Sequence, residues 1–215
     1  MDYDVVIIGG GIHGVGVAQA AAVRGYKTLL IEQYNELAQG TSSRSSKLIH
    51  GGLRYLEQFE FSLVRECLFE RSYLLNNAPD LVKLKPVYIP IYRNSKRPPW
   101  MVCTGLSMYA LLGNLTAAAR FRRIPKQQWT QLHNLKTENL RAVYQYYEAQ
   151  TDDRLLTQSV MRSAQAYGAG LMLNTKVTSI GLIEDHFNIS CEFNSEAIKP
   201  ITSKTVINAA GPWAK

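Results

Sequence analysis

Asp4-Val-Val-Ile-Ile-Gly-Gly-Gly-Ile-His-Gly14 is the stretch of sequence that decides the fold of this chain. A short apolar run that ends in glycines is typical of a buried parallel strand. The glycines fit the pattern G-x-G-x-x-G, in which the first permits a tight turn, the second lets backbone approach a pyrophosphate, and the third lets helix and strand pack closely. The following helix would present its N–H groups to the phosphates. The candidate dinucleotide-binding residues here are Gly9, Gly11, Ile12 and Gly14.

A helix and a second strand complete a β-α-β unit. Small residues dominate positions 12–24, and Gly25 is placed to end the helix. Thr28-Leu-Leu-Ile31 reads as a buried strand, and Glu32 follows it, eighteen residues past Gly14. A carboxylate at this place can bind the ribose hydroxyls of a dinucleotide. It disfavours NADP, whose extra phosphate favours an arginine, but this motif leaves both NAD and FAD open.

The rest of the chain alternates loops, helices and strands. Residues 33–52 are rich in Ser, Thr and Gly and predict a loop. Leu53, Leu56, Leu63, Cys67 and Leu74 recur at near-helical spacing and predict a long amphipathic helix at about 56–77. We further expect an edge strand at 87–92, a helix capped by Asp152 and Asp153 and running to Tyr167, strands at 171–173, 177–183, 187–193 and 205–208, and a turn at 209–213.

Composition indicates a folded globular protein, with 46% hydrophobic and 19% charged residues in 215. The three cysteines are far apart and form no CxxC pair, which argues against a disulfide framework and a zinc site and favours a reducing, cytoplasmic compartment. The acidic start lacks the basic region of a secretion signal. No acid, histidine or cysteine cluster has metal-ligand spacing, so no metal is predicted. His13, His133 and His186 show no partner pattern and are interpreted as structural or solvated.

The net charge of +7 is concentrated in one segment. Residues 81–126 hold nine basic residues and no acidic one, whereas residues 1–80 sum to −2 and residues 127–215 to zero. Basic clustering attracts phosphates, nucleic acid or anionic lipid by the same physics, so the location of the charge matters more than its total. We predict no nucleic-acid partner, and nothing in the sequence indicates an oligomeric state.

A longer stretch decides between the two nucleotides. Gly40-Thr-Ser-Ser-Arg-Ser-Ser-Lys-Leu-Ile-His-Gly-Gly-Leu-Arg-Tyr-Leu-Glu57 closely resembles the segment that follows the ADP-binding unit in FAD-dependent (aerobic) glycerol-3-phosphate dehydrogenases. The resemblance covers essentially the whole chain, including Ile8–Gly25, Arg97-Pro-Pro-Trp-Met101, Asp152-Asp-Arg-Leu155 and Asn208-Ala-Ala-Gly-Pro-Trp213. One departure is Ala20, where that family usually has an aspartate.

The resemblance implies an α/β, Rossmann-like FAD-binding fold of the glutathione-reductase and D-amino-acid-oxidase type, with an inserted and incomplete substrate region. Three segments follow from it. Residues 1–80 would form the FAD-binding β-α-β unit, flavin loop and long helix; 81–150 an inserted basic and apolar region that contacts substrate or membrane; and 151–215 the return to the FAD-binding domain.

The same resemblance assigns the loop that wraps the FAD. Hydroxyl and N–H groups of such a loop can bind phosphate and flavin oxygens. The implied cofactor residues are Thr41, Ser42, Ser43, Ser46, Lys47 and Leu48 in this loop, Val177 near the adenine, and Ala210 and Gly211 in the last turn. From the residues alone, an ordinary turn-rich loop would explain positions 41–48 equally well.

Arg54 is the predicted substrate residue, with Tyr55 beside it. A guanidinium binds phosphate through a two-pronged fork that lysine lacks, and the place of Arg54 matches the family's phosphate-binding arginine. His50 stands where related flavoenzymes have a histidine that faces the flavin. It would act as general base, removing the hydroxyl proton while hydride leaves for the flavin. His50 and Arg54 are therefore the catalytic candidates.

Residues 98–119 contain no charge and are flanked by basic residues. The length suits a membrane span, but Pro98, Pro99 and several polar residues lower its hydropathy. We expect a buried or membrane-surface helix whose flanking cations meet anionic lipid, or equally a solvated basic face over a buried helix. Because the resembling enzymes pass electrons to membrane quinone, the predicted location is cytoplasmic, with a peripheral contact on the inner face of the cell membrane.

The predicted function is oxidation of sn-glycerol 3-phosphate to dihydroxyacetone phosphate, with FAD as cofactor and quinone as electron acceptor. Two alternatives stay open: an amine or amino-acid oxidase of the same fold, and a non-catalytic FAD-binding fragment. In the family, further substrate-domain strands, phosphate-binding residues and a flavin-contacting glycine motif lie beyond the place matched by Gly211. We therefore expect these 215 residues alone to bind FAD poorly and to turn over little.

Overall fold

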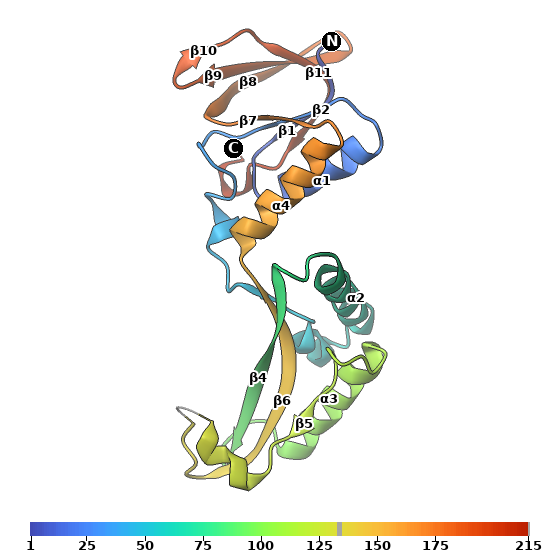
Figure 1. Cartoon of the computed structure of the whole chain (residues 1–215), viewed down its shortest axis with the longest axis vertical. Helices are drawn as coiled ribbons and strands as arrows, with labels where there is room; N and C mark the ends of the chain where they lie inside the picture. Colours follow the sequence, from blue (N-terminus) through green and yellow to red (C-terminus); the bar gives the residue numbers. More distant parts are fainter. Residues whose placement is uncertain (133–134, 215) are drawn as a thin grey trace. The chain divides into compact units, whose positions relative to one another are not determined.

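The computed structural model describes residues 1–132 and 135–214, so His133 lies outside the described residues. The chain divides into two compact units (Figure 1). The first unit comprises Met1–Lys47 and Asp152–Lys215, and the second comprises Leu48–Thr151. The segment 81–150 that we expected as an insertion lies within the second unit, which also contains residues 48–80.

A mixed sheet forms the centre of the first unit. Its strands are β1 (Tyr3–Ile8), β2 (Thr28–Ile31), β7 (Gly170–Met172), β8 (Thr175–Ile183), β9 (His186–Phe193), β10 (Glu196–Ala197) and β11 (Ile201–Asn208). They run in the order β10-β9-β11-β1-β2-β7, with β8 paired to β9. The four strands β11, β1, β2 and β7 are parallel, and β9 is antiparallel to β11. The predicted parallel β-α-β unit is therefore confirmed.

Two helices, α1 (Ile12–Val23) and α4 (Asp153–Ala166), lie side by side on one face of this sheet (Figure 1). They pack on it through small and apolar residues; the buried cluster includes Ile7, Val15, Ala18, Leu30, Met161 and Ala164. Alternate strand residues, among them Val6 and Leu29, face a second cluster with β9. The predicted cap of α4 is also confirmed, because the Asp152 carboxylate accepts hydrogen bonds from the N–H groups of Arg154 and Leu155.

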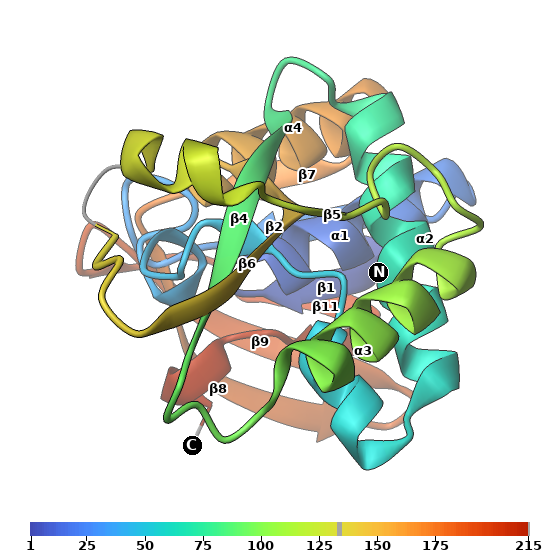
Figure 2. The same ribbon diagram turned by 90° about the horizontal axis from the view of Figure 1, so that it is seen from below.

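The second unit is built on a long antiparallel strand pair. Its elements are β3 (Leu48–Ile49), α2 (Phe61–Asn77), β4 (Val82–Tyr92), α3 (Pro99–Leu112), β5 (Arg122–Arg123), β6 (Leu140–Thr151) and 3₁₀ helices at Leu53–Gln58 and Lys126–Gln131. β6 pairs with β3, β4 and β5. Helices α2 and α3 lie on the same side of β4 and β6 in both views (Figure 2). Because β4 pairs only with β6 among the described strands, it is the expected edge strand.

Our prediction of a helix at 56–77 was wrong at its start and in its buried face. A 3₁₀ helix covers Leu53–Gln58, Phe59 has a left-handed φ of 59°, and α2 begins only at Phe61. The left-handed residue breaks the helical path, which keeps the two helices separate. The fully buried side of α2 is Val64, Leu68 and Arg71, one residue round from the predicted stripe at Leu63 and Cys67.

Two further expectations in this unit need correction. We predicted no strand for residues 140–151, but β6 lies there and is the central strand of the sheet. The uncharged segment 98–119 forms a helix only as far as Leu112, and Leu106, Tyr109 and Ala110 are its buried residues. Among the residues that the structure describes, no helix has the length and apolar content needed to cross a membrane.

Candidate functional site

The glycine turn after β1 is closed by backbone contacts with the two neighbouring strands. Gly9 has φ of +111° and donates its N–H to the Ile31 carbonyl at 2.8 Å, while Ala209 donates to the Ile8 carbonyl at 2.8 Å. A Cβ on Gly14 would collide with the carbonyl oxygen of Gly9. The start of α1 therefore lies directly against the turn, and its first N–H groups lack intrahelical partners, as a pyrophosphate site requires.

Glu32 is held by the turn that it was predicted to accompany. Its Oε2 accepts a hydrogen bond from the Gly10 N–H at 2.6 Å, and its Oε1 accepts one from the Tyr34 N–H at 3.0 Å. The side chain is buried. Since two carboxylate oxygens offer about four acceptor positions, acceptor capacity remains for ribose hydroxyls. The sequence did not single out Gly10, although a Cβ there would lie 2.9 Å from Glu32 Oε2.

The predicted flavin loop begins beside the same helix start. Thr41–Ser43 form a short 3₁₀ helix, and the Ser42 hydroxyl accepts a hydrogen bond from the Ile12 N–H at 3.0 Å. A Cβ on Gly11 would lie 3.1 Å from this hydroxyl. Ser42, Ile12 and Gly11 thus share one small polar region in the first unit.

The following residues of the loop are tied to the first turn of α4. Lys47 Nζ donates to the Ser43 carbonyl at 3.0 Å and lies 3.4 Å from the Asp153 carboxylate, which also accepts from the Ser45 hydroxyl. Ser46 is exposed. The sequence did not identify Asp153 as a partner of this loop, because the residues are more than a hundred positions apart.

The last turn of the chain returns to the same region. Ala210 donates its N–H to Asn208 Oδ1 at 3.0 Å, and Gly211 has φ of +62°. The ring of Trp213 lies where a Cβ on Gly40 would be, and it meets the ring of Tyr34 edge-on with centroids 6.5 Å apart. The structure thereby brings together the glycine turn, Glu32, the start of the flavin loop and the 209–213 turn.

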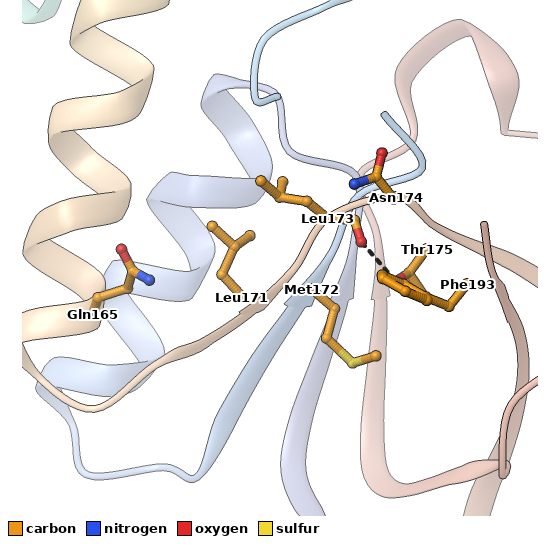
Figure 3. A pocket seen from close by; sticks show the side chains of 7 residues that line it. All are labelled: Gln165, Leu171, Met172, Leu173, Asn174, Thr175 and Phe193. Atoms are coloured by element: carbon orange, nitrogen blue, oxygen red, sulfur yellow. Dashed lines mark hydrogen bonds between the residues drawn. The ribbon is translucent and has the colours of Figure 1, made fainter. Parts of the chain in front are cut away.

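An open pocket of about 390 Å³ lies at the carboxyl end of β7 (Figure 3). It is lined by Gln165, Leu171, Met172, Leu173, Asn174, Thr175 and Phe193. The Thr175 N–H donates to the Glu32 carbonyl at 2.9 Å, so the pocket begins next to the nucleotide residues. Ligands of open α/β sheets bind outside the carboxyl ends of the parallel strands, which makes this pocket a place for part of a cofactor.

Two predicted cofactor residues lie elsewhere. Val177 is on β8 opposite Cys191 and packs against the buried cluster that contains Val6 and Leu29. Leu48 belongs to the second unit, where it pairs with Gln150 of β6. The side chain of Val177 is used in this packing, which leaves its main chain for the predicted contact with the cofactor.

The predicted substrate residues all lie in the second unit. His50, Arg54 and Tyr55 are exposed, and Arg54 and Tyr55 lie in the 3₁₀ helix Leu53–Gln58. Arg54 makes no salt bridge within the described residues, whereas the nearby Arg97 pairs with Glu57. An exposed guanidinium without a carboxylate partner is available to an anion.

Tyr146 on β6 senses the charge of Arg54. Burial is the main cause that raises the pKa of Tyr146 to about 12; the Glu148 carboxylate also raises the pKa, and the charges of Arg71 and Arg54 lower it. The effect of Arg54 places its charge within electrostatic reach of this phenol. Two of the charges that act on Tyr146, those of Glu148 and Arg71, belong to a buried group of polar residues.

That buried polar group was missed by sequence analysis. Arg71 of α2 is 1% exposed and lies 3.1 Å from the Glu148 carboxylate, which also accepts the Gly51 N–H at 2.9 Å. The signal was present, because Arg71 continues the buried spacing of Val64 and Leu68, where a charge must have a partner. Its partner could not be read from the sequence. Among the described residues there is no group of three or more side chains able to hold a metal ion.

Comparison with known proteins places these features in a family. Residues 4–215 match the family described as FAD dependent oxidoreductase. The chain is 41% identical over 211 residues to a glycerol-3-phosphate dehydrogenase of Pseudomonas aeruginosa, covering 98% of this chain and 40% of the relative. It is 36% identical over 223 residues to an aerobic glycerol-3-phosphate dehydrogenase of Staphylococcus aureus, covering 99% and 39%. The chain thus spans about 40% of the length of these curated relatives.

Solved structures agree with the fold. The glycerol-3-phosphate dehydrogenase from Bacillus halodurans, complexed with FAD, matches with a TM-score of 0.73 and 30% identity, covering 99% of this chain and 35% of that one. The L-proline dehydrogenase from P. horikoshii matches with a TM-score of 0.70 and 20% identity, covering 98% and 53%, which is a likeness of fold alone. The predicted Rossmann-like fold is therefore confirmed.

Proposed function

Because the chain belongs to the family of FAD-dependent oxidoreductases, we propose that it carries out part of the FAD-dependent oxidation of sn-glycerol 3-phosphate to dihydroxyacetone phosphate. The observation that carries the proposal is the likeness to glycerol-3-phosphate dehydrogenases over nearly the whole chain. The chain covers about 40% of the length of such a relative, so we propose that its residues supply only part of the site for this reaction.

The first unit would bind the ADP part of FAD. A Cβ on Gly9 would collide with the backbone of Ala209, and a Cβ on Gly14 would collide with the Gly9 carbonyl, so the turn requires glycine at both places. Such a tight glycine turn suits the close approach of a pyrophosphate. Glu32 would bind ribose, and the 41–43 segment and Ala210-Gly211 would contact the cofactor through backbone and hydroxyl groups. The pocket next to Thr175 is our candidate place for the adenine end.

The second unit would bind and activate the substrate. Arg54 would hold the phosphate by its two-pronged fork, with Tyr55 beside it. His50 would accept the hydroxyl proton as the carbon–hydrogen bond breaks and a carbonyl forms. The flavin, when bound, supplies the acceptor for the hydride. The two electrons then pass to an external acceptor, which we propose to be quinone.

A peripheral membrane contact would suit a quinone acceptor. Helix α3 carries exposed apolar residues, among them Trp100 and Leu111, and basic residues flank it in sequence. Such a surface suits anionic lipid headgroups and the acyl boundary below them. We propose that the protein works at the cytoplasmic side of a membrane without crossing it.

The test is direct. The purified chain is titrated with FAD and its visible spectrum recorded, and oxidation of sn-glycerol 3-phosphate is followed with an artificial electron acceptor. In line with the poor FAD binding and low turnover expected of these 215 residues alone, we expect weak thermal stabilisation by FAD, and loss of the small substrate response in Arg54→Ala but not in Arg162→Ala, an arginine of the first unit. A protein that FAD does not stabilise would contradict the cofactor proposal. FAD binding without turnover would favour a non-catalytic FAD-binding piece, and turnover of amino acids instead would favour the oxidase alternative.

A further inference from the structure

The chain between His50 and Arg54 leaves the sheet at a fixed point. β3 ends at Ile49, which pairs with Ala149 of β6. The next residue along β6 toward its start is Glu148, whose Oε2 accepts the Gly51 N–H at 2.9 Å after the sheet pairing has ended. The Glu148 side chain thus satisfies a backbone N–H group that no longer has a partner in the β ladder.

The carboxylate that holds Gly51 is itself held by a buried guanidinium. Arg71 Nη1 donates to Glu148 Oε2 at 3.1 Å, to the Tyr109 hydroxyl at 2.9 Å and to the Tyr147 carbonyl at 3.0 Å, and Nη2 donates to the Ala118 carbonyl at 2.9 Å. Arg71 is on α2, Tyr109 on α3 and Glu148 on β6. One buried cluster therefore joins both helices, the central strand and the turn.

The turn fits this cluster without spare space. A Cβ on Gly51 would collide with the Tyr109 hydroxyl, and Gly52 has φ of +77°, a conformation that favours glycine. Gly52 is the residue from which the 3₁₀ helix Leu53–Gln58 starts. The position of Arg54 on the first turn of that helix is consequently set by how Gly51 and Gly52 are held.

Stability alone does not explain a buried ion pair here. Removing two charges from water costs free energy, and a well-packed apolar pair of similar volume is often as stable or more so. A charged pair has another property: it accepts a specific N–H in a specific direction, with hydrogen bonds stronger than those of neutral groups. Here that N–H is the one of Gly51, in the backbone segment that leads to Arg54.

We infer that Arg71, Glu148 and Tyr109 form a positioning cluster that fixes the Gly51-Gly52 turn and thereby aims Arg54 at the phosphate of the substrate. The inference rests on the proposed phosphate role of Arg54. Glu148 and Arg71 are positioning residues, since they act through the turn and not on the substrate itself.

The experiment measures phosphate binding in the folded chain. Backbone amide shifts of residues 50–55 are followed by ¹H–¹⁵N NMR during titration with sn-glycerol 3-phosphate, with inorganic phosphate and glycerol as separate probes. Glu148→Asp keeps the charge near Arg71 but shortens the reach to Gly51, and Glu148→Gln keeps the reach but removes the charge. Glu66→Gln, an exposed carboxylate on α2, is the matched control.

We expect both Glu148 variants to lose hydrogen-exchange protection at the Gly51 amide and to bind sn-glycerol 3-phosphate about tenfold more weakly, while Glu66→Gln stays as the wild type. Denaturant midpoints recorded in parallel identify a purely structural role, which would lower the midpoint but leave the affinity of the folded protein unchanged. If Glu148→Gln does not fold because Arg71 is left as an unpaired buried charge, Glu148→Asp and Tyr109→Phe give the answer.

Folded Glu148→Asp with wild-type affinity and wild-type Gly51 protection would overturn the inference. Loss of binding in Arg54→Ala alongside that result would leave the proposed function standing. If residues 50–55 of the wild type respond to neither sn-glycerol 3-phosphate nor inorganic phosphate, the phosphate role of Arg54 fails, and the aiming role falls with it.

Discussion

The Gly10 N–H donates a hydrogen bond of 2.6 Å to the Glu32 carboxylate. This contact links the middle of the glycine turn to the end of the second parallel strand. The glycines and the acidic residue of the dinucleotide motif are therefore in direct contact. A carboxylate in this position therefore has two tasks. It shapes the turn through its bond to Gly10, and it is our candidate for binding ribose.

The variant Glu32→Gln tests both roles of this carboxylate. The amide can accept from only one of the two N–H groups, so the other loses its partner. We expect the free energy of unfolding to fall by about 1.5–3 kcal/mol, the range for hydrogen bonds to charged groups. FAD affinity should fall at least about tenfold. Urea denaturation and FAD titration measure these effects, with the exposed Glu184→Gln as control; equal behaviour of the two variants would contradict the assignment.

Gly14 and Gly16 provide a matched pair on one helix. A Cβ at Gly14 would meet the backbone carbonyl of Gly9, whereas a Cβ at Gly16 would meet nothing within 4 Å. Gly14→Ala should destabilise the protein by about 1–3 kcal/mol or more and abolish FAD binding, because backbone cannot give way as a flexible side chain can. Gly16→Ala should stabilise by up to about 1 kcal/mol. Denaturant unfolding of both variants checks this, and a neutral Gly14→Ala would contradict it.

The first unit was predictable because its signals are local. Apolar runs, the glycine spacing and the Asp152 cap each act within a few residues, and buried parallel strands such as β1 are nearly all apolar. The meeting of Trp213 with Gly40 is different, since nothing near either residue indicates the other.

Strand β6 of the second unit could not be predicted from the sequence, for a physical reason. β6 is interrupted by polar residues, yet Gln145 and Glu148 are buried because distant side chains satisfy them. Gln145 Oε1 accepts from Arg122 at 2.8 Å, and Glu148 accepts from Arg71, 77 positions away. A rule based on alternating apolar residues excludes such a strand. The hydrogen-bond partners that allow its polar side chains to be buried lie far away in the sequence.

Tyr146 should titrate as an alkaline group whose pKa reports the charges around it. Burial is the main cause that raises its pKa to about 12, above the usual range of a tyrosine; Glu148 also raises the pKa, and Arg71 and Arg54 lower it. Glu148→Gln should therefore lower the pKa of Tyr146, and Arg54→Ala should raise it. Because the folded pKa lies above the unfolded one, the neutral phenol contributes stability below pH 10 that is lost as the pH rises through about 12. ¹³C NMR of the tyrosine Cζ atoms, assigned with Tyr146→Phe, measures these shifts; opposite signs would contradict the arrangement.

Helix α3 should carry the membrane contact. Trp100, Met101, Met108 and Leu111 are exposed and fall on one helical face, opposite the buried Tyr109. Trp100 and Leu111 are 68% and 65% exposed. We expect the protein to sediment with vesicles that contain anionic lipid and to be released by high salt, because the flanking cations are screened.

The double variant Trp100→Ala/Leu111→Ala should reduce vesicle binding at least about tenfold, since each fully buried apolar side chain of this size contributes about 1.5–3 kcal/mol. Leu182→Ala is the control, because Leu182 is 67% exposed but belongs to the first unit, away from any basic flank in the sequence. Binding that depends on Leu182 as strongly as on α3 would indicate unspecific adhesion of apolar surface. Binding to neutral vesicles as tight as to anionic ones would remove the role of the basic residues and leave the exposed face of α3 as the sole attraction.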